Sequence, residues 1–310
     1  MRVSRTIMLL LIPALLPMSG CLYMDVEGFG RFNRDFHFSF PMKQGGGHLT
    51  VESFNGGVEI SAWDQSTIDI SGTKYAPTSD QADAMKVDVD HTPEAVSVRA
   101  ERQYDWHGNH GVRFAIKVPR GTVLDRIVTS NGSIHASDAS GPARLKSSNG
   151  SMRVERFRGS LDAQTSNSSV ELYDVEGDAT VHSSNGRIRA EGIRGSLEAD
   201  TSNSGVTAIL ERADRPVRVE SRNGSIDLTL PAGFTGGVRA HTSNSGITLR
   251  LADPVNARVM ARTSNSGITS DFDARMHGEL RKNEMDGEIG SGGMLLDLET
   301  SNSSIRLLRR

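Results

Sequence analysis

A segment centred on asparagine recurs from residue 131 onward at nearly constant spacing. Asn131, Asn149, Asn167, Asn185 and Asn203 follow one another at a strict spacing of 18. Asn223, Asn244 and Asn265 continue the series at spacings of 20, 21 and 21, and Asn302 follows after 37. The last interval leaves room for one degenerate repeat around Asn283. A fixed period of about 20 residues is typical of stacked repeat architectures, in which no single repeat can bury its own apolar face.

Each repeat contains two short segments of alternating apolar residues. The first begins three residues after the asparagine, as at Met152 and Val154. The second follows a glycine, as at Leu161 and Ala163 after Gly159. A period of two indicates β-strands that bury one face. Such repeats form either a meander of antiparallel hairpins or a solenoid, in which each repeat lies directly on the one before at roughly 4.8 Å.

Charged residues at one outward position favour the solenoid. Successive copies read His135, Arg153, Glu171 and Arg189, so no like charges fall on adjacent repeats. This order is expected when the residues are lateral neighbours in a sheet. The sequence therefore predicts an all-β protein with a single-stranded parallel β-solenoid (β-helix) over residues 126–310. About ten coils are expected, each as long as one sequence repeat.

The repeated asparagine has a structural explanation. Asn tolerates the left-handed conformation that a tight corner needs, and its amide can bond to nearby backbone. Amides stacked in register can also bond to one another and form a ladder. We expect a structural ladder at Asn131, Asn149, Asn167, Asn185, Asn203, Asn223, Asn244, Asn265 and Asn302. A serine precedes most of them, and the alternative interpretation of this Ser-Asn row is a ligand-binding face, for example for carbohydrate.

The N-terminal segment, residues 1–20, has the features of a lipoprotein signal peptide. Arg2 and Arg5 precede an apolar run over residues 6–18. This run is too short to cross a bilayer, which needs about 20 residues. Met18-Ser19-Gly20-Cys21 resembles the lipobox of bacterial lipoproteins, in which the cysteine becomes the first mature residue and carries lipid. Cys21 is the only cysteine, so a disulfide within one chain is excluded.

In the lipoprotein resemblance, Leu22 after the cysteine implies sorting to the outer membrane if the host is a double-membraned bacterium. We therefore expect residues 1–20 to be removed, Cys21 to carry lipid, and residues 21–47 to form a tether. Several acyl chains would anchor the protein stably, because one chain alone binds a membrane only marginally.

Residues 48–125 carry short alternating segments that are expected to form a β-rich cap domain. Solenoids need atypical end units, and this domain would close the N-terminal end of the stack. Asn55 already resembles a repeat corner, and residues 78–85 are the one segment with a helical pattern. At the other end, Arg306 and Arg309 place charge on the last strand, which would discourage edge-to-edge association.

The segment KVPRGTVLDRIVTSNGSI (residues 117–134) is followed by recurrent T-S-N-[SG]-x-[IV] corners. Together they resemble the bacterial "putative adhesin" β-solenoid domains. The resemblance covers roughly residues 46–310. It implies a β-solenoid fold and an adhesin-like role.

The main enzymatic alternative is a carbohydrate-processing β-helix, a polysaccharide lyase or hydrolase that is either active or degenerate. That chemistry needs paired carboxylates at a defined separation in a groove. The acidic column in this chain is interrupted, because the positions equivalent to Asp138 in the next three repeats are Arg156, Asp174 and Gly192. Connections between strands are short and offer few loops to wall a groove. The sequence therefore favours a protein that is not an enzyme.

His107 and His110 lie in a glycine-rich loop and form the best isolated candidate for a metal site. The candidate is weak, because a structural zinc would take further ligands that this loop lacks. No phosphate-binding loop or dinucleotide fingerprint appears, so no cofactor is expected. The formal net charge of −3, without a charged tail, gives no indication of nucleic-acid binding. We therefore expect a non-enzymatic cell-envelope lipoprotein, held at the membrane by lipid, with a structural or binding role toward envelope proteins or polysaccharide.

Overall fold

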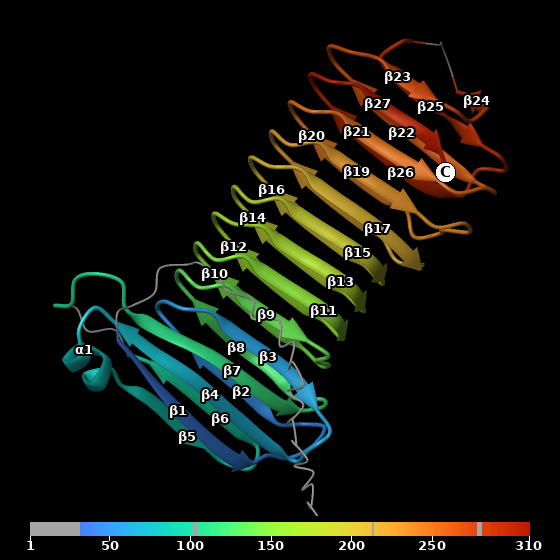
Figure 1. Ribbon diagram of the computed structural model, residues 1–310. Coiled ribbons are helices and arrows are strands. Elements are labelled where there is room, and N and C mark those ends of the chain that lie inside the picture. The colour runs from blue at the N-terminus through green and yellow to red at the C-terminus, as the bar shows by residue number, and fades with distance from the viewer. Residues whose placement is uncertain (1–31, 102–104, 213, 278–280) are drawn as a thin grey trace, which may run out of the picture.

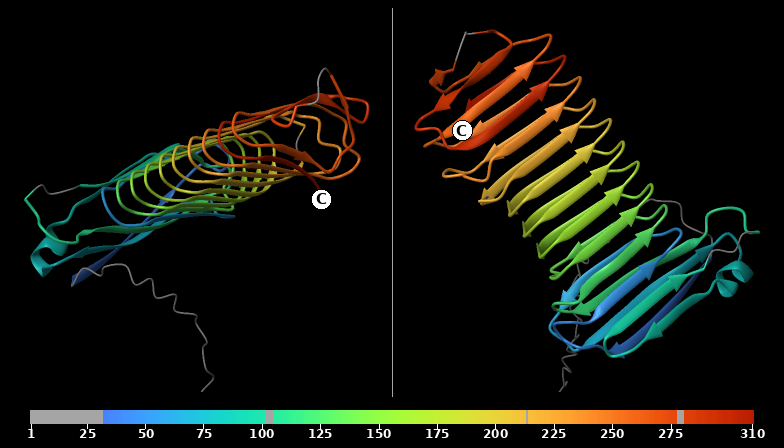
Figure 2. Two further views of the ribbon diagram at one scale, coloured as in Figure 1. Left: turned by 90° about the horizontal axis from the view of Figure 1, so that it is seen from above. Right: turned by 180° about the vertical axis from the view of Figure 1, so that it is seen from behind.

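The structure is a computed structural model that describes residues 32–101, 105–212, 214–277 and 281–310. Its strands form two long sheets that face each other, and the chain winds between them as a stack of flat coils (Figures 1 and 2). The expected all-β parallel solenoid is therefore confirmed.

Sheet A has 13 strands and sheet B has 14. From the N-terminal end, sheet A contains β1 (Phe32–Pro41), β4 (Thr67–Ala76), β7 (Gly111–Pro119), β3 (Val58–Trp63), β9 (Ile134–Ser137), β11 (Met152–Arg158), β13 (Val170–Glu176), β15 (Ile188–Arg194), β17 (Val206–Arg212), β19 (Ile226–Leu230), β21 (Ile247–Leu251), β27 (Ile305–Arg309) and β23 (Ile268–Ser270). From the same end, sheet B contains β5 (Val87–His91), β6 (Ala95–Ala100), β2 (His48–Glu52), β8 (Val123–Thr129), β10 (Ala143–Ser147), β12 (Leu161–Thr165), β14 (Ala179–Ser183), β16 (Leu197–Thr201), β18 (Val217–Ser221), β20 (Val238–Thr242), β26 (Met294–Thr300), β22 (Ala257–Thr263), β25 (Glu284–Ile289) and β24 (Ala274–Met276).

Each coil contributes one strand to each sheet, and neighbouring coils pair in parallel. In sheet A, Val170 of β13 lies between Met152 of β11 and Ile188 of β15. Sheet B keeps the same kind of register from β10 to β20. Because one turn of the coil equals one sequence repeat, chemically equivalent residues become lateral neighbours.

The inward residues of both sheets fill the space between them. In β10, Ala143, Leu145 and Ser147 are buried, whereas Arg144 and Lys146 are exposed. Full burial of a leucine side chain, such as that of Leu145, contributes about 1.5–3 kcal/mol to the stability of the fold. Since the buried residues of successive coils touch, the core is one continuous apolar column that no single coil could form.

At one edge of the stack, successive glycines approach each other closely. Gly159 and Gly177 have φ of 134° and 129°, a conformation that residues with a side chain rarely adopt. A Cβ added to Gly177 would lie 2.3 Å from the carbonyl oxygen of Gly159. Glycine is therefore required here by both the backbone conformation and the distance to the next coil.

The N-terminal coils do not stack in sequence order. β6 and β7 form the outermost coil of parallel strands, and β2 and β3 lie between this coil and the one formed by β8 and β9. β4 and β5 pair antiparallel with β7 and β6, and β1 pairs antiparallel with β4. The strands of residues 48–125 therefore share both sheets and the core with the rest of the solenoid.

β1 lies within the predicted tether of residues 21–47. Its Phe36 ring meets Phe114 edge-on at 5.8 Å between centroids, and its Phe40 ring stacks on His91 at 3.9 Å. The tether prediction is therefore wrong for residues 32–41, because alternating phenylalanines pack this strand against the end of the core. The segment before β1 lies outside the described residues.

Helix α1 (Ser79–Ala84) packs beside β1 and β4. The hydroxyl of Thr78 caps its first turn by accepting a hydrogen bond from the backbone N–H of Gln81. Arg34 of β1 donates to the carboxylate of Asp83 at 2.5 Å and ties the helix to the edge strand. The helix predicted over residues 78–85 is confirmed.

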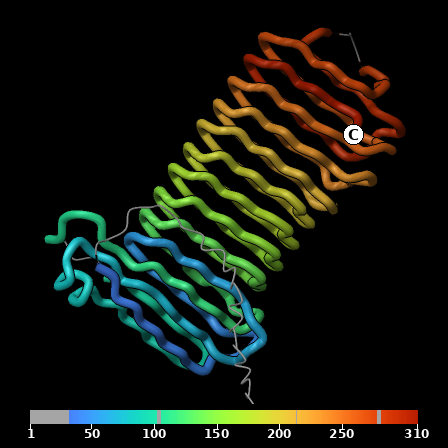
Figure 3. The backbone as a smooth tube through the Cα atoms, in the orientation of Figure 1, coloured from blue at the N-terminus to red at the C-terminus, as the bar shows by residue number. Residues whose placement is uncertain are grey.

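At the C-terminal end, the last coil is inserted between two earlier ones. β26 and β27 pair with β20 and β21 on one side and with β22 and β23 on the other. Figure 3 shows this red segment between orange ones. β25 pairs antiparallel with both β22 and β24. The prediction of a degenerate coil around Asn283 is therefore wrong, because this part of the chain reverses direction and forms antiparallel pairs instead of a further coil.

The insertion also changes which strand forms the end of sheet A. β27 is an interior strand, so Arg306 and Arg309 do not protect an edge as the sequence suggested. The three-residue β23 takes that place. A short edge strand offers few unpaired backbone groups to another chain.

Gly177→Ala is expected to lower the free energy of unfolding by about 1–3 kcal/mol, because the new Cβ is strained at this φ and meets the Gly159 carbonyl. Gly46→Ala is the matched control, since a Cβ there has no heavy atom within 4 Å. Urea unfolding followed by circular dichroism measures both variants. Equal unfolding midpoints would contradict the close stacking of these glycines.

Candidate functional site

The corner asparagines form one continuous row of side-chain hydrogen bonds, which we call the asparagine ladder. Each Nδ2 donates to the Oδ1 of the asparagine in the neighbouring coil. The bonds run from Asn149 to Asn131 (2.7 Å), Asn167 to Asn149 (2.7 Å), Asn185 to Asn167 (2.8 Å), Asn203 to Asn185 (2.7 Å), Asn223 to Asn203 (2.8 Å), Asn244 to Asn223 (2.6 Å), Asn302 to Asn244 (2.7 Å) and Asn265 to Asn302 (2.6 Å). Asn302 precedes Asn265 in space because its coil is the inserted one.

A second row of hydrogen bonds lies directly inside the corner. Two residues before each ladder asparagine, a buried Thr or Ser hydroxyl donates to a backbone carbonyl of the neighbouring coil. The hydroxyl of Ser147 donates to Gly132 O at 3.1 Å and accepts from Gly150 N at 2.9 Å, and Thr165 donates to Gly150 O at 3.2 Å. The corner is thus held from outside by amides and from inside by hydroxyls.

A third row, the serine row, lies between these two in sequence and points outward. It consists of Ser130, Ser148, Ser166, Ser184, Ser202, Ser243, Ser264 and Ser301, and Arg222 takes the equivalent place in one coil. The backbone carbonyl of Ser130 accepts from the N–H groups of Ser148 and Asn149 at 3.2 and 2.9 Å. The hydroxyls of the serine row make no hydrogen bond to any residue that the structure describes.

Part of the serine row borders a recess of about 350 Å³ on sheet B, which we call the serine recess. Ser202, Ser243 and Ser301 form one side of it, together with Arg222. Asp200, Glu220, His241 and Glu299 form the other side and occupy equivalent positions in four neighbouring coils. The recess therefore places a row of hydroxyls beside a row of carboxylates.

The carboxylates of the serine recess differ in how closely they are paired, since Glu220 has a close ion pair and Glu299 has only a distant one. Glu220 accepts from Arg218 of its own strand at 2.8 Å. His241 Nε2 lies 4.0 Å from the nearer oxygen of Glu299 and 3.4 Å from Asp297, and has no hydrogen-bond partner among the described residues. Glu299 is 63% exposed, so its oxygens remain available to a ligand from solvent.

A second recess, of about 550 Å³, lies at the opposite edge of the stack. It contains the column of Asp138, Arg156 and Asp174, whose φ values of 57°, 49° and 54° are uncommon for residues with a side chain. Arg156 donates to both oxygens of Asp138 at 2.8 Å. This hydrogen bond holds the pKa of Asp138 below its usual range. In the interrupted acidic column, Asp138 is thus held in a charge pair with Arg156.

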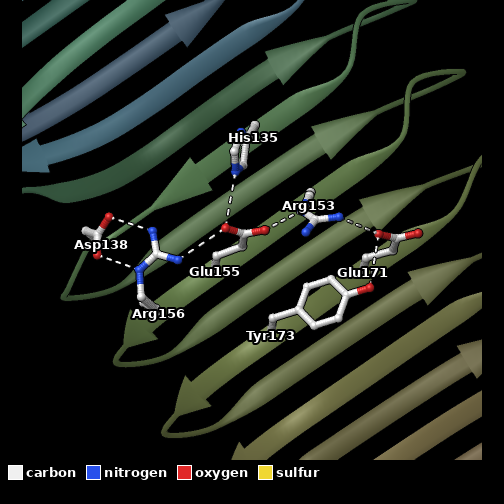
Figure 4. A network of polar contacts seen from close by, with 7 residues as sticks. All are labelled: His135, Asp138, Arg153, Glu155, Arg156, Glu171 and Tyr173. Carbon is white, nitrogen blue, oxygen red and sulfur yellow. Dashed lines mark hydrogen bonds and ion pairs between the residues drawn. The ribbon is translucent and has the colours of Figure 1, made fainter. Parts of the chain in front are cut away.

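The same pairing extends over the outer face of sheet A (Figure 4). Arg153 bonds to Glu155 on its own strand and to Glu171 on the next coil, the latter at 3.2 Å. Tyr173 donates to Glu171 at 3.3 Å, and Arg156 reaches Glu155 at 3.3 Å. Hydrogen bonding to Arg153 lowers the pKa of Glu155. Charged groups on this face therefore satisfy one another.

The weak metal candidate lies in a further corner of the coil stack. His110 is 6% exposed and packs against Trp106, and its Nδ1 lies 3.0 Å from Gly108 O. Because a carbonyl oxygen can only accept, Nδ1 carries the proton of this hydrogen bond. Among the described residues, no group of three or more His, Cys, Asp or Glu is placed to hold a metal ion, and His107 is exposed. Cys21 lies outside the described residues.

Asn109, between those histidines, is a corner residue that sequence reasoning missed. Asn55 Nδ2 donates to Asn109 Oδ1 at 3.3 Å, as in the ladder. Val58 lies three residues after Asn55, whereas its strand partner Phe114 lies five residues after Asn109. The two extra residues break the spacing that identifies the other corners. Only the pair Gly108-Asn109 indicates a corner at this place in the sequence.

Asn185→Leu is expected to lower the free energy of unfolding by about 1–3 kcal/mol, because it removes one hydrogen bond to Asn167 and one from Asn203. Ser184→Ala on the same turn is the control, and its unbonded hydroxyl predicts an effect close to zero. Thermal unfolding of both variants tests the ladder. A larger effect from Ser184→Ala than from Asn185→Leu would contradict it.

Acid is expected to remove the contribution of the Asp138–Arg156 pair. A carboxyl whose pKa is depressed in the folded state stabilises that state above its unfolded pKa of about 3.9, and this contribution is lost as pH falls through the folded pKa. For a pair this exposed the gain is under about 1 kcal/mol. Melting temperatures of the wild type and Asp138→Asn should therefore differ slightly at pH 6 and converge toward pH 2. A difference that does not change with pH would argue against the pair.

Comparison with known proteins finds one family model and several solved structures that are similar to this chain. Residues 173–309 match the family model of a domain of unknown function, DUF7330. No curated protein matches the chain. In the described residues, no helix is long and apolar enough to span a membrane.

Three solved structures align along most of the chain. A "putative adhesin" from Bacteroides fragilis is 10% identical with a TM-score of 0.39 and covers 91% of this chain and 100% of its own. A "putative cell adhesion protein" from Clostridium sporogenes is 8% identical with a TM-score of 0.23 and covers 89% and 100%. A "putative lipid binding protein" from Parabacteroides distasonis is 11% identical with a TM-score of 0.37 and covers 89% and 96%.

Proposed function

We propose that this protein is a lipid-anchored component of the cell envelope whose solenoid is a non-enzymatic, adhesin-like binding surface. The observation that carries the proposal is the constancy of one exposed edge. Eight corners present an outward serine beside a ladder asparagine, whereas other exposed columns change from coil to coil. The outward column of sheet A, for example, reads His135, Arg153, Glu171, Arg189 and Thr207 along the stack.

The proposed location in the cell envelope rests on the N-terminal sequence. The apolar run of residues 6–18 and the lipobox-like segment before Cys21 support export and lipid attachment. Both lie outside the described residues. A lipid at this end would leave the opposite end of the column free to extend away from the membrane, with the serine row running along its length.

A carbohydrate-processing enzyme is the second candidate, and the serine recess favours it. Asp200 and Glu220 are lateral neighbours on adjacent coils, and paired carboxylates are the groups that glycosidases use. Incubation of the chain from Leu22 onward with a panel of polysaccharides, followed by reducing-end analysis, separates the candidates. Turnover that is lost in Glu220→Gln would establish the enzyme and overturn the binding proposal.

The binding role itself is tested by co-sedimentation of the chain from Leu22 onward with washed envelope fragments that lack the endogenous protein. Retention that saturates with added protein is expected for a specific surface. Retention no greater than that of an unrelated soluble protein of similar charge would overturn the proposal.

Cys21→Ala is expected to release the full-length protein from the membrane fraction, because the lipid can no longer be attached. Fractionation followed by immunoblotting measures the membrane-bound share. Ser19→Ala is the control, since it keeps a small residue in the lipobox-like segment and the cysteine. Equal membrane retention of Cys21→Ala and the wild type would exclude lipid anchoring through this residue.

A further inference from the structure

The hydroxyls of the serine row contribute no hydrogen bond to the fold of the described residues. Their backbone carbonyls bond to the next coil, but their side chains bond to nothing among the described residues. Arg222, which takes the place of serine in one coil, shows that the fold does not require a small side chain in the serine row. Beside it, Asn223 still donates to Asn203 at 2.8 Å and accepts from Asn244 at 2.6 Å. A corner with a long side chain in the serine row is thus as well bonded as the others.

The chain itself shows how exposed positions change when the fold does not constrain them. The outward position near the end of each sheet B strand is one example. In successive coils it reads Gln164, His182, Asp200, Glu220 and His241. The serine row, two residues further on, keeps a hydroxyl in eight coils. Since the fold does not require the hydroxyl, its persistence indicates a requirement from outside the chain.

The serine recess is where this row meets a concave surface. Ser202, Ser243 and Ser301 border it over neighbouring coils, opposite Glu220 and Glu299. Equivalent groups repeat along the stack at roughly 4.8 Å, the spacing of strands in a sheet. A ligand that fits this arrangement presents regularly spaced polar groups along its own length.

The chemistry of the recess selects among such ligands. A serine hydroxyl both donates and accepts, and a carboxylate accepts only. Three carboxylates against one guanidinium, from Arg222, disfavour polyanions such as nucleic acids and polyuronates. Neutral hydroxyl groups satisfy both sides of the recess, because they donate to the carboxylates and exchange hydrogen bonds with the serines.

We propose that the serine recess binds an unbranched, neutral, hydroxyl-rich polysaccharide whose chain runs along the solenoid axis. The inference rests on the proposed binding function and names its ligand class and its place on the molecule. Ser202, Ser243 and Ser301 bond to sugar hydroxyls from one side, and Glu220 and Glu299 accept hydrogen bonds from the other.

The test measures binding of the chain from Leu22 onward to immobilised unbranched glucan and mannan, with polygalacturonate as the anionic comparison. The wild type is expected to bind at least one neutral polymer and to bind it more tightly than polygalacturonate. Failure to bind either neutral polymer, or preference for polygalacturonate, would overturn the ligand class.

The triple variant Ser202→Ala, Ser243→Ala, Ser301→Ala tests the place of binding. Loss of three hydrogen bonds should weaken binding about tenfold or more while the melting temperature stays unchanged. The control is Ser130→Ala, Ser148→Ala, Ser166→Ala, which removes three hydroxyls of the same row outside the recess. Equal binding by the first triple variant and the wild type would overturn the proposed site, as would a larger loss in the control.

Glu299→Gln provides a second and independent variant. Its carboxylate is largely exposed and has only a distant contact to His241, so the fold should not depend on it. Binding should weaken severalfold, since an amide is a poorer acceptor than a carboxylate. If envelope fragments still retain the protein while no neutral polysaccharide binds, the binding function stands and this inference fails.

Discussion

The in-register stacking of the Asn corner is the interaction on which the rest of the structure depends. The ladder amides are exposed, but the hydroxyls inside each corner are buried, and buried polar groups must be paired. A single coil has no partners for them. Each coil therefore completes the corner of its neighbour. Every ladder asparagine is followed by its sheet A strand after three residues, in the shorter and the longer coils alike. The additional residues of the longer coils fall at the opposite edge, for example between β19 and β20.

A stack built in this way has two open ends, and the chain closes them by different means. At the N-terminal end, antiparallel strands and the phenylalanines of β1 cover the exposed core. At the C-terminal end, the last coil is inserted inward and leaves the short β23 at the edge. In both places a coil lies out of sequence order. The edge of a parallel stack can accept such a coil because any strand with the same register of inward residues fits there.

The repeat itself could be predicted because its signals are local. The spacing from Asn131 to Asn203, the alternating apolar residues and the glycines each report on one coil and its neighbour. The order of coils at the ends could not be predicted, since β27 carries the same pattern as any interior strand. The charge order seen in the outward column of sheet A from His135 to Arg189 does not extend to sheet B. Arg218 and Arg239 are lateral neighbours, and each is compensated by a carboxylate elsewhere, Glu220 for the first and Asp297 for the second.

The register that stabilises the column also determines where it has hydrogen-bonding groups to offer. Lateral neighbours on the outer face of sheet A bond to one another, as Arg153 does to Glu171, and so have little left for a ligand. The ladder amides likewise use one donor and one acceptor on each other. The serine row is different, because the backbone alone links its residues and the hydroxyls remain unused. The serine row therefore leaves a repeated hydroxyl on eight coils of one edge, and this is the polar group that the stacking of the coils does not use.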